Sequence, residues 1–171
     1  DLKRPPVIAM SMGALLEVTD VSSDGKWLAL SCGRYVFAGH VAPLGVTAPD
    51  PVAVAERFLG TPYLWGGRSA EGIDCSGLVQ VALASAGIRA PRDSDLQAGF
   101  GTGVEQAARG DILCYRGHVA LDRGDGTLVH ATAGFMAVVV EPREALEARI
   151  RAESGTPPDQ PVLRAIRRPA P

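Results

Sequence analysis

The spacing of apolar residues predicts a mixed α and β structure, with short strands first, helices in the middle and further strands towards the end. Apolar runs separated by turn residues predict strands over residues 7–10, 14–18, 27–31 and 34–37. Asp24-Gly25 favours a hairpin turn between the second and third of these, because both residues accept a positive φ readily. The pattern therefore predicts a small β module over residues 1–45.

The next segment changes from strand-like to helical patterning. Residues 42–51 contain three prolines, which remove backbone donors and restrict φ, so we expect a linker, taken as residues 46–51. Asp50 before Pro51 is typical of a helix start and predicts a helix over residues 52–59. Apolar residues with helical spacing predict a second, buried helix over residues 75–86, which Gly87 ends.

Strand-like alternation returns in the second half of the chain. The predicted strands cover residues 111–115, 118–122, 127–132 and 136–140. Gly124-Asp125-Gly126 predicts a hairpin turn between the second and third of them. A charge-rich helix is expected over residues 141–151, and the proline-rich tail from about residue 154 is expected to be extended or partly disordered. The fold class is therefore α+β, with a second domain over residues 52–171.

The charge balance excludes some partners. The formal net charge is −2, with 21% charged and 46% apolar residues, so no basic surface for nucleic acid or anionic lipid is expected. No apolar run approaches the roughly 18 residues of a membrane span. Because the chain begins at Asp1 rather than Met, we expect it to be trimmed or processed.

Three widely spaced cysteines do not describe a disulfide framework. Cys32 and Cys114 have apolar neighbours and are interpreted as small buried residues, although Cys114 lies only four positions before His118 and its role stays open. This usage favours a reducing, cytoplasmic compartment and leaves a periplasmic or extracellular one open. Oligomeric state is not indicated.

Cys75 carries the chemistry expected of a nucleophile. It follows a glycine-rich loop and opens the second predicted helix, whose positive end can lower a thiol pKa of about 8.5 to somewhere between ~3.5 and ~7.5. His118 and His130 lie on two strands joined by the Gly124–Gly126 turn, and a hairpin can bring them side by side. A thiol at a helix start, with histidines on later strands, is the layout of a papain-like hydrolase.

Six motifs occur in the order found in one family. They are residues 60–67 (GTPYLWGG), 72–79 (GIDCSGLV), 91–94 (PRDS), 109–112 (RGDI), 117–120 (GHVA) and 129–131 (VHA). Over residues 52–141 the chain resembles the NlpC-type cell-wall cysteine peptidases, which have a papain-like fold. More loosely, residues 7–41 resemble a bacterial SH3-like β-barrel that is short at its N-terminal end.

The resemblance implies a function and a set of site residues. It implies cleavage of peptidoglycan stem peptides between D-glutamate, at its γ-carboxyl, and a diamino acid, as in γ-D-glutamyl-L-diamino acid endopeptidases. Cys75 would be the nucleophile, His118 the base and His130 the orienting residue, with no cofactor or metal. Four further positions carry over less directly. Tyr63 would help to bind the oxyanion, Asp74 and Ser76 would hold a free N-terminal L-alanine amine, and Ser94 would touch the substrate.

Each of these residues also has a purely structural interpretation. Asp74 is a favoured N-cap residue, and Tyr63 and Trp65 could be core aromatics. A zinc site built from the two histidines with Cys75 and Cys114 lacks the close ligand pairs usual for such sites. Two other functions stay open: a wall-binding module that no longer cuts, and an amidase or acyltransferase on the same fold.

Overall fold

The computed structural model describes residues 5–170, so the ends of the two predicted domain ranges, residues 1–4 and 171, lie outside it. The chain divides into two compact units between Thr47 and Ala48. Among the described residues, no helix is both long enough and apolar enough to cross a bilayer.

The smaller unit contains one antiparallel sheet of three strands in the order β1-β2-β3. They are β1 (Val18–Val21), β2 (Trp27–Leu30) and β3 (Tyr35–Phe37), and a single 3₁₀ turn, η1 (Ala38–His40), follows them. Gly25 has φ +70° in the predicted β1–β2 hairpin turn. Trp27 packs edge-on against Phe37, with ring centroids 5.6 Å apart.

Three predictions for this unit are wrong. Residues 7–10 form no strand, because no strand pairs with them and their apolar side chains stay in solvent, with Val7 76% exposed. The strand predicted over residues 14–18 instead occupies Val18–Val21. Cys32, expected to be buried, is exposed in the turn between β2 and β3. Whether this sheet is an SH3-like barrel stays a prediction.

The larger unit is built on a six-stranded antiparallel sheet in the order β10-β9-β8-β7-β11-β6. Its strands are β6 (Thr102–Val104), β7 (Ile112–Tyr115), β8 (His118–Asp122), β9 (Thr127–Thr132), β10 (Ala137–Pro142) and β11 (Ala165–Arg168). The helices are α1 (Pro51–Glu56), α2 (Cys75–Ser85), α3 (Ser94–Gln97) and α4 (Arg143–Ser154), and β4 (Arg68–Ser69) pairs with β5 (Gly72–Ile73) in a small ribbon.

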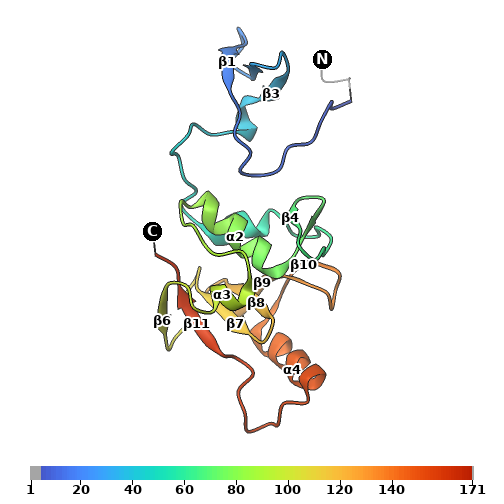
Figure 1. Ribbon diagram of the computed structural model, residues 1–171, viewed down its shortest axis with the longest axis vertical. Coiled ribbons are helices and arrows are strands. Elements are labelled where there is room, and N and C mark those ends of the chain that lie inside the picture. Colours follow the sequence, from blue (N-terminus) through green and yellow to red (C-terminus); the bar gives the residue numbers. More distant parts are fainter. Residues whose placement is uncertain (1–4, 171) are drawn as a thin grey trace. The chain divides into compact units, whose positions relative to one another are not determined.

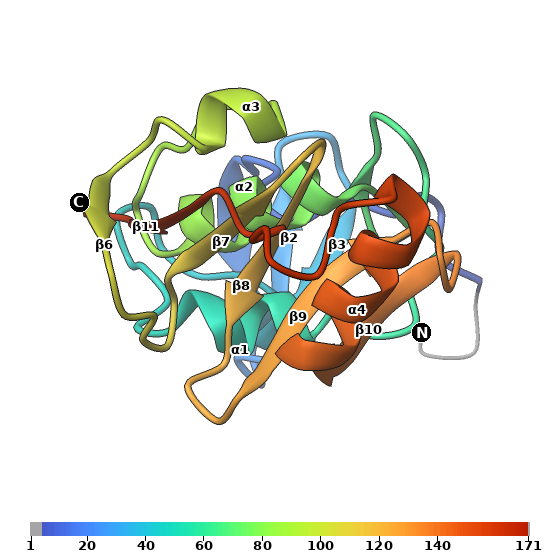
Figure 2. The same cartoon turned by 90° about the horizontal axis from the view of Figure 1, so that it is seen from below.

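Helices cover both faces of this sheet (Figures 1 and 2). Helices α1 and α2 pack on the face that carries Val119, Val129 and Ala131, and with them form the main core. Helix α4 crosses β9 and β10 on the other face, where its Leu146 joins a second core with Leu128. Side chains of a strand point alternately to its two faces, so β9 contributes to both cores.

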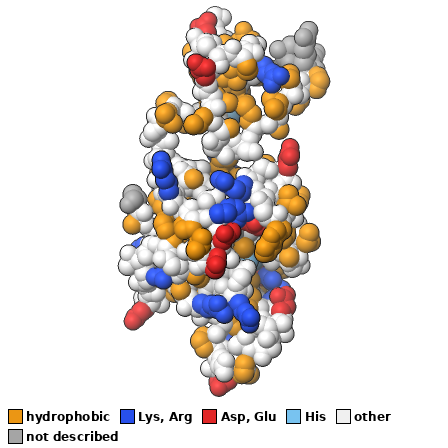
Figure 3. All heavy atoms as spheres, in the orientation of Figure 1, with side chains coloured by type: hydrophobic (Ala, Val, Ile, Leu, Met, Phe, Trp, Pro, Cys, Tyr) orange, Lys and Arg blue, Asp and Glu red, His pale blue; other side chains and the backbone are white. Residues whose placement is uncertain are grey.

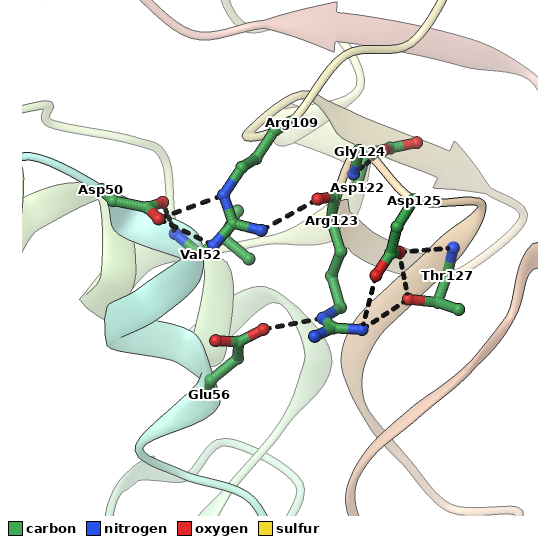
Figure 4. A network of polar contacts seen from close by, with 9 residues as sticks. All are labelled: Asp50, Val52, Glu56, Arg109, Asp122, Arg123, Gly124, Asp125 and Thr127. Atoms are coloured by element: carbon green, nitrogen blue, oxygen red, sulfur yellow. Dashed lines mark hydrogen bonds and ion pairs between the residues drawn. The ribbon is translucent and has the colours of Figure 1, made fainter.

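A network of charged residues joins the start of α1 to the β8–β9 turn (Figure 4). Arg109 donates to Asp50 and to the carbonyl of Arg123, and Arg123 in turn donates to Glu56 at 2.7 Å. Asp50 also caps α1 by accepting from the N–H of Val52. On the face seen in Figure 3, basic, acidic and apolar side chains of this unit are interspersed.

The helices and the β7–β10 meander lie close to their predicted positions, but the tail does not. Strand β11 inserts between β7 and β6, whereas an extended or disordered tail was expected. Burial explains the difference, because Val162 and Ile166 join the second core and offset the cost of ordering the tail. The strands β8 and β9 match their predicted bounds, and Gly87 follows α2 at φ +83°.

Candidate active site

Cys75 is the first residue of α2, and Asp74 explains why the helix begins there. The Asp74 carboxylate accepts hydrogen bonds from the N–H groups of Gly77 and Gly66, each at 2.7 Å. The first bond satisfies a donor in the first turn of the helix, and the second ties the glycine-rich loop to it. The thiol therefore lies at a helix N-terminus that Asp74 fixes by bonding both to the helix and to the preceding loop.

Two glycines allow the loop and the helix to approach closely. A Cβ on Gly77 would lie 2.4 Å from the carbonyl oxygen of Gly67, and a Cβ on Gly67 would lie 2.4 Å from that of Gly72. Neither distance is compatible with a side-chain atom, so both positions require glycine. The GTPYLWGG segment thus serves backbone packing around the thiol.

The environment of Cys75 does not favour a resting thiolate, contrary to the sequence-based expectation. Burial raises the pKa of the Cys75 thiol, and the negative charge of Asp74 acts in the same direction. The N–H groups of Val119 and Ser76 oppose this without overcoming it. The contact with Val119 places the thiol beside the residue that follows His118. The thiol therefore needs a base.

The two histidines meet as the hairpin predicts. The Nε2 atom of His118 lies 2.8 Å from Nδ1 of His130, and the two rings are nearly perpendicular. His118 is the first residue of β8, and His130 is in the neighbouring strand β9, fully buried. One nitrogen must donate and the other accept, so the protonation of one ring depends on that of the other.

Both imidazoles are held neutral. Burial lowers the pKa of His118 to about 3, with further contributions from His130 and from the positive charge of Arg149. Burial and the same arginine lower the pKa of His130 to about 4. A neutral imidazole has one unprotonated nitrogen, so the pair can accept a proton at neutral pH.

Five of the sequence-predicted residues line one pocket of about 450 Å³: Tyr63, Asp74, Cys75, Ser76 and Ser94. Gly117, directly before His118, lines the same pocket. Burial raises the pKa of Tyr63, and the nearby Cys75 and Asp74 add to the effect, so its phenol keeps a proton to donate. A hollow of about 440 Å³ elsewhere in the larger unit is lined by none of the predicted site residues.

A model of the NlpC/P60 family matches residues 60–146 of the 171-residue chain. The chain belongs to the NlpC/P60 family. The matched segment contains Cys75, His118 and His130 and all six quoted motifs, so the resemblance is confirmed. The predicted fold class is confirmed as well, because the structural neighbours of the chain are NlpC/P60 proteins.

Two similar proteins come from Bacillus cereus. The gamma-D-glutamyl-L-lysine dipeptidyl-peptidase of Bacillus cereus (strain ATCC 10987 / NRS 248) is 33% identical over 126 residues, 68% of this chain and 38% of that protein. The crystal structure of an NlpC/P60 family protein from Bacillus cereus ATCC 10987 has a TM-score of 0.65 at 25% identity, covering 91% of this chain and 54% of that one. The chain spans about two fifths of the length of the first curated relatives it matches.

Another NlpC/P60 structure shows that a protein with this fold can lack catalytic activity. RipD from Mycobacterium tuberculosis is described as a non-catalytic NlpC/p60 domain protein adapted to peptidoglycan binding. It has a TM-score of 0.52 at 25% identity, over 69% of this chain and 93% of its own. Membership of the family therefore does not show whether a domain cleaves peptidoglycan or only binds it. That distinction depends on the residues of the site.

Sequence reasoning gave no role to several residues of this NlpC/P60 site. Arg92 donates to both oxygens of Asp74, at 2.9 and 2.6 Å, and to Ser76 Oγ at 2.9 Å. The buried Gln97 donates to the carbonyls of Ser76 and Pro91 and so ties α3 to α2. The PRDS motif contains Arg92 and could have drawn attention to it, but no local pattern marks Gln97.

Trp65 lies where the sequence did not suggest, whereas Cys114 is buried as expected. Trp65, considered as a core aromatic, is 85% exposed and lines the pocket. Cys114 is buried in the main core, where burial raises the pKa of its thiol to about 11. Within residues 5–170, no three His, Cys, Asp or Glu side chains are grouped so that they could hold a metal ion.

Proposed function

We propose that this chain is a cysteine endopeptidase that cuts peptidoglycan stem peptides at the bond between γ-D-glutamate and a diamino acid. The observation that supports it best is the juxtaposition of the His118 and His130 rings, 2.8 Å apart, within an NlpC/P60 domain whose Cys75 lines a substrate-sized pocket. The name of the Bacillus cereus relative supports the same bond class.

The chemistry proceeds in two halves. His118 takes the thiol proton as Cys75 Sγ bonds to the γ-carbonyl carbon of D-glutamate, and the oxygen becomes an oxyanion. The backbone N–H of Cys75 and the Tyr63 hydroxyl are the proposed donors to that oxygen. Collapse expels the diamino acid amine, which takes the proton from His118 and leaves a thioester on Cys75.

Water completes the cycle. His118 removes one proton from water as its oxygen attacks the thioester carbon, and the collapse releases the thiolate and the γ-carboxylic acid, which loses its proton to solvent. The thiolate then takes the proton back from His118. His130 keeps the base oriented throughout both halves. No cofactor or metal has a place in this sequence of steps.

The remaining predicted residues have roles in substrate binding. Asp74 and Ser76 are proposed to meet the free amine of an N-terminal L-alanine, and Ser94 to contact the peptide. An ammonium group would share the Asp74 carboxylate with Arg92, since Arg92 already donates to both of its oxygens. The partner is thus a murein peptide. The free thiol of the exposed Cys32 supports a reducing, cytoplasmic compartment.

The deciding experiment compares wild type with Cys75→Ala on L-Ala-γ-D-Glu-meso-diaminopimelate, followed by mass spectrometry. Wild type alone should release L-Ala-D-Glu and diaminopimelate. A lack of cleavage by wild type, with the peptide free or attached to glycan, would refute the proposal. Binding without turnover would then favour the RipD-like alternative, and product formed only with an added acceptor amine would favour an acyltransferase.

A further inference from the structure

The orienting histidine has a neighbour of its own. His130 uses Nδ1 to contact His118, and its other ring nitrogen, Nε2, lies 2.8 Å from Oε1 of Glu141. That contact is at ion-pair distance but bent away from the hydrogen-bond direction, and within residues 5–170 the buried Nε2 has no hydrogen-bond partner. The Glu141 carboxylate is therefore the group that decides whether Nε2 carries a proton.

Sheet register places the carboxylate beside the ring. Val139 of β10 stands opposite His130 of β9, and Glu141, two residues further along, points to the same face. Glu141 is 8% exposed, so its charge is largely withdrawn from water. A buried carboxylate is costly unless a cation and hydrogen bonds compensate it.

Helix α4 supplies that cation. Arg149 Nη2 donates to Glu141 Oε1, and its guanidinium also lies over the Phe135 ring, 5.3 Å from the centroid. The arginine is thus held between β10 and the β9–β10 turn. Because Arg149 neutralises the carboxylate and packs on an aromatic ring, Glu141 cannot turn away from His130 without leaving a charge unpaired.

Electrostatics then determines the tautomers. A bare nitrogen lone pair 2.8 Å from a carboxylate oxygen would place two electron-rich atoms in contact, so Nε2 of His130 carries the proton. Nδ1 of His130 is then an acceptor, and His118 must donate to it from Nε2. A neutral His118 protonated on Nε2 has its free lone pair on Nδ1, the nitrogen able to take a proton.

We propose that Glu141, held by Arg149, is a positioning residue that fixes both imidazoles as Nε2–H tautomers and so leaves His118 Nδ1 as the base for the Cys75 thiol. The site is then a relay of four side chains, Cys75–His118–His130–Glu141. This inference rests on the proposed function, in which His118 is the base.

The first test uses the wild-type protein and no substrate. In ¹⁵N-histidine-labelled protein, two-dimensional ¹H–¹⁵N NMR of the ring nitrogens distinguishes Nδ1–H from Nε2–H imidazole. The proposal expects His130, identified by its loss in His130→Gln, to be protonated on Nε2 at pH 7. A His130 protonated on Nδ1 would overturn the proposal, whatever the protein does to peptides.

The second test separates positioning from ion pairing. Glu141→Gln keeps an acceptor oxygen, Glu141→Leu removes it, and Glu141→Leu with Arg149→Met removes the ion pair as a whole. The readout is the rate of Cys75 alkylation by iodoacetamide, in a Cys32→Ser background because Cys32 is exposed. Glu56→Gln is the matched control, since Glu56 also pairs with an arginine at 2.7 Å and makes no contact with the histidines.

We expect Glu141→Leu and the double variant to slow alkylation about 10- to 100-fold and to mix the tautomers, while Glu141→Gln and Glu56→Gln stay within about threefold. Unchanged alkylation and tautomers in the folded double variant would overturn the proposal. Neither readout uses a peptide. If wild type failed to cut stem peptides, the proposed function would be refuted, but the alkylation rates and tautomers could still be interpreted.

Discussion

Arg92 holds Asp74 with two parallel hydrogen bonds, at 2.9 Å to Oδ1 and 2.6 Å to Oδ2. Burial alone would raise the pKa of Asp74, but the bonds from Arg92 and from two backbone N–H groups outweigh it and keep the pKa below its ordinary value. The carboxylate that caps the helix of the nucleophile is therefore ionised, and both of its oxygens already accept hydrogen bonds. Its proposed contact with a substrate amine can be tested separately from its role as a cap.

Asp74→Asn makes that separation. Asn is as good an N-cap as Asp and keeps the bond from Gly77, but it carries no charge for an ammonium group. If Asp74 binds the substrate amine, kcat/KM for a free-amine peptide should fall about tenfold more than for its N-acetylated form, since a hydrogen bond to a charged group contributes about 1.5–3 kcal/mol. An equal fall for both peptides would assign Asp74 to capping alone.

Gly77→Ala tests the close approach of the loop to α2. The new Cβ would lie 2.4 Å from the Gly67 carbonyl oxygen, so the backbone must shift. We expect a loss of about 1–3 kcal/mol in the free energy of unfolding, measured with urea, together with reduced activity. Gly99→Ala is the matched control because its Cβ would meet nothing closer than 3.6 Å. Equal stability of the two variants would contradict the packing argument.

The raised pKa of Cys75 predicts that the resting enzyme holds a thiol rather than a thiolate–imidazolium pair. A thiol with a pKa above about 8.5 is less than roughly 3% ionised at pH 7. The difference in absorbance at 240 nm between wild type and Cys75→Ala should therefore be small at pH 7 and rise only in the alkaline range. Full thiolate absorbance at pH 6 would show that the histidine pair ionises the thiol before substrate arrives.

The residues of the site differ in how far local sequence determines them. The start of α2 at Cys75 follows from Asp74 and the helical spacing after it, and the meeting of His118 with His130 follows from a short turn between two alternating strands. Both depend on neighbours in the chain, so pattern and turn chemistry predict them. The same holds for Gly87, which ends α2 with a positive φ.

The parts that were missed depend on packing between distant segments. Glu141 meets His130 only through the β9–β10 register, and Arg149 reaches Glu141 only because α4 crosses those strands. The pairing of β11 with β7 links residues about 50 positions apart. No local pattern in the proline-rich tail predicts this pairing. Local patterns set the nucleophile and the base, while tertiary contacts set the charges around them.

The buried histidines also make stability depend on pH. Burial lowers the pKa of His130 to about 4, below the value of about 6.5 that it has in the unfolded chain. Between these two values the unfolded chain binds a proton that the folded protein does not, so stability is lost as the pH falls through this window. The loss attributable to His130 approaches about 1.4 kcal/mol per pH unit, and a His130→Gln variant removes it.

Urea unfolding of both proteins at pH 7, 6 and 5 should therefore give converging free energies as the pH falls. A constant difference across that range would mean that His130 is already protonated in the folded protein at pH 7, or that folding leaves its pKa unchanged.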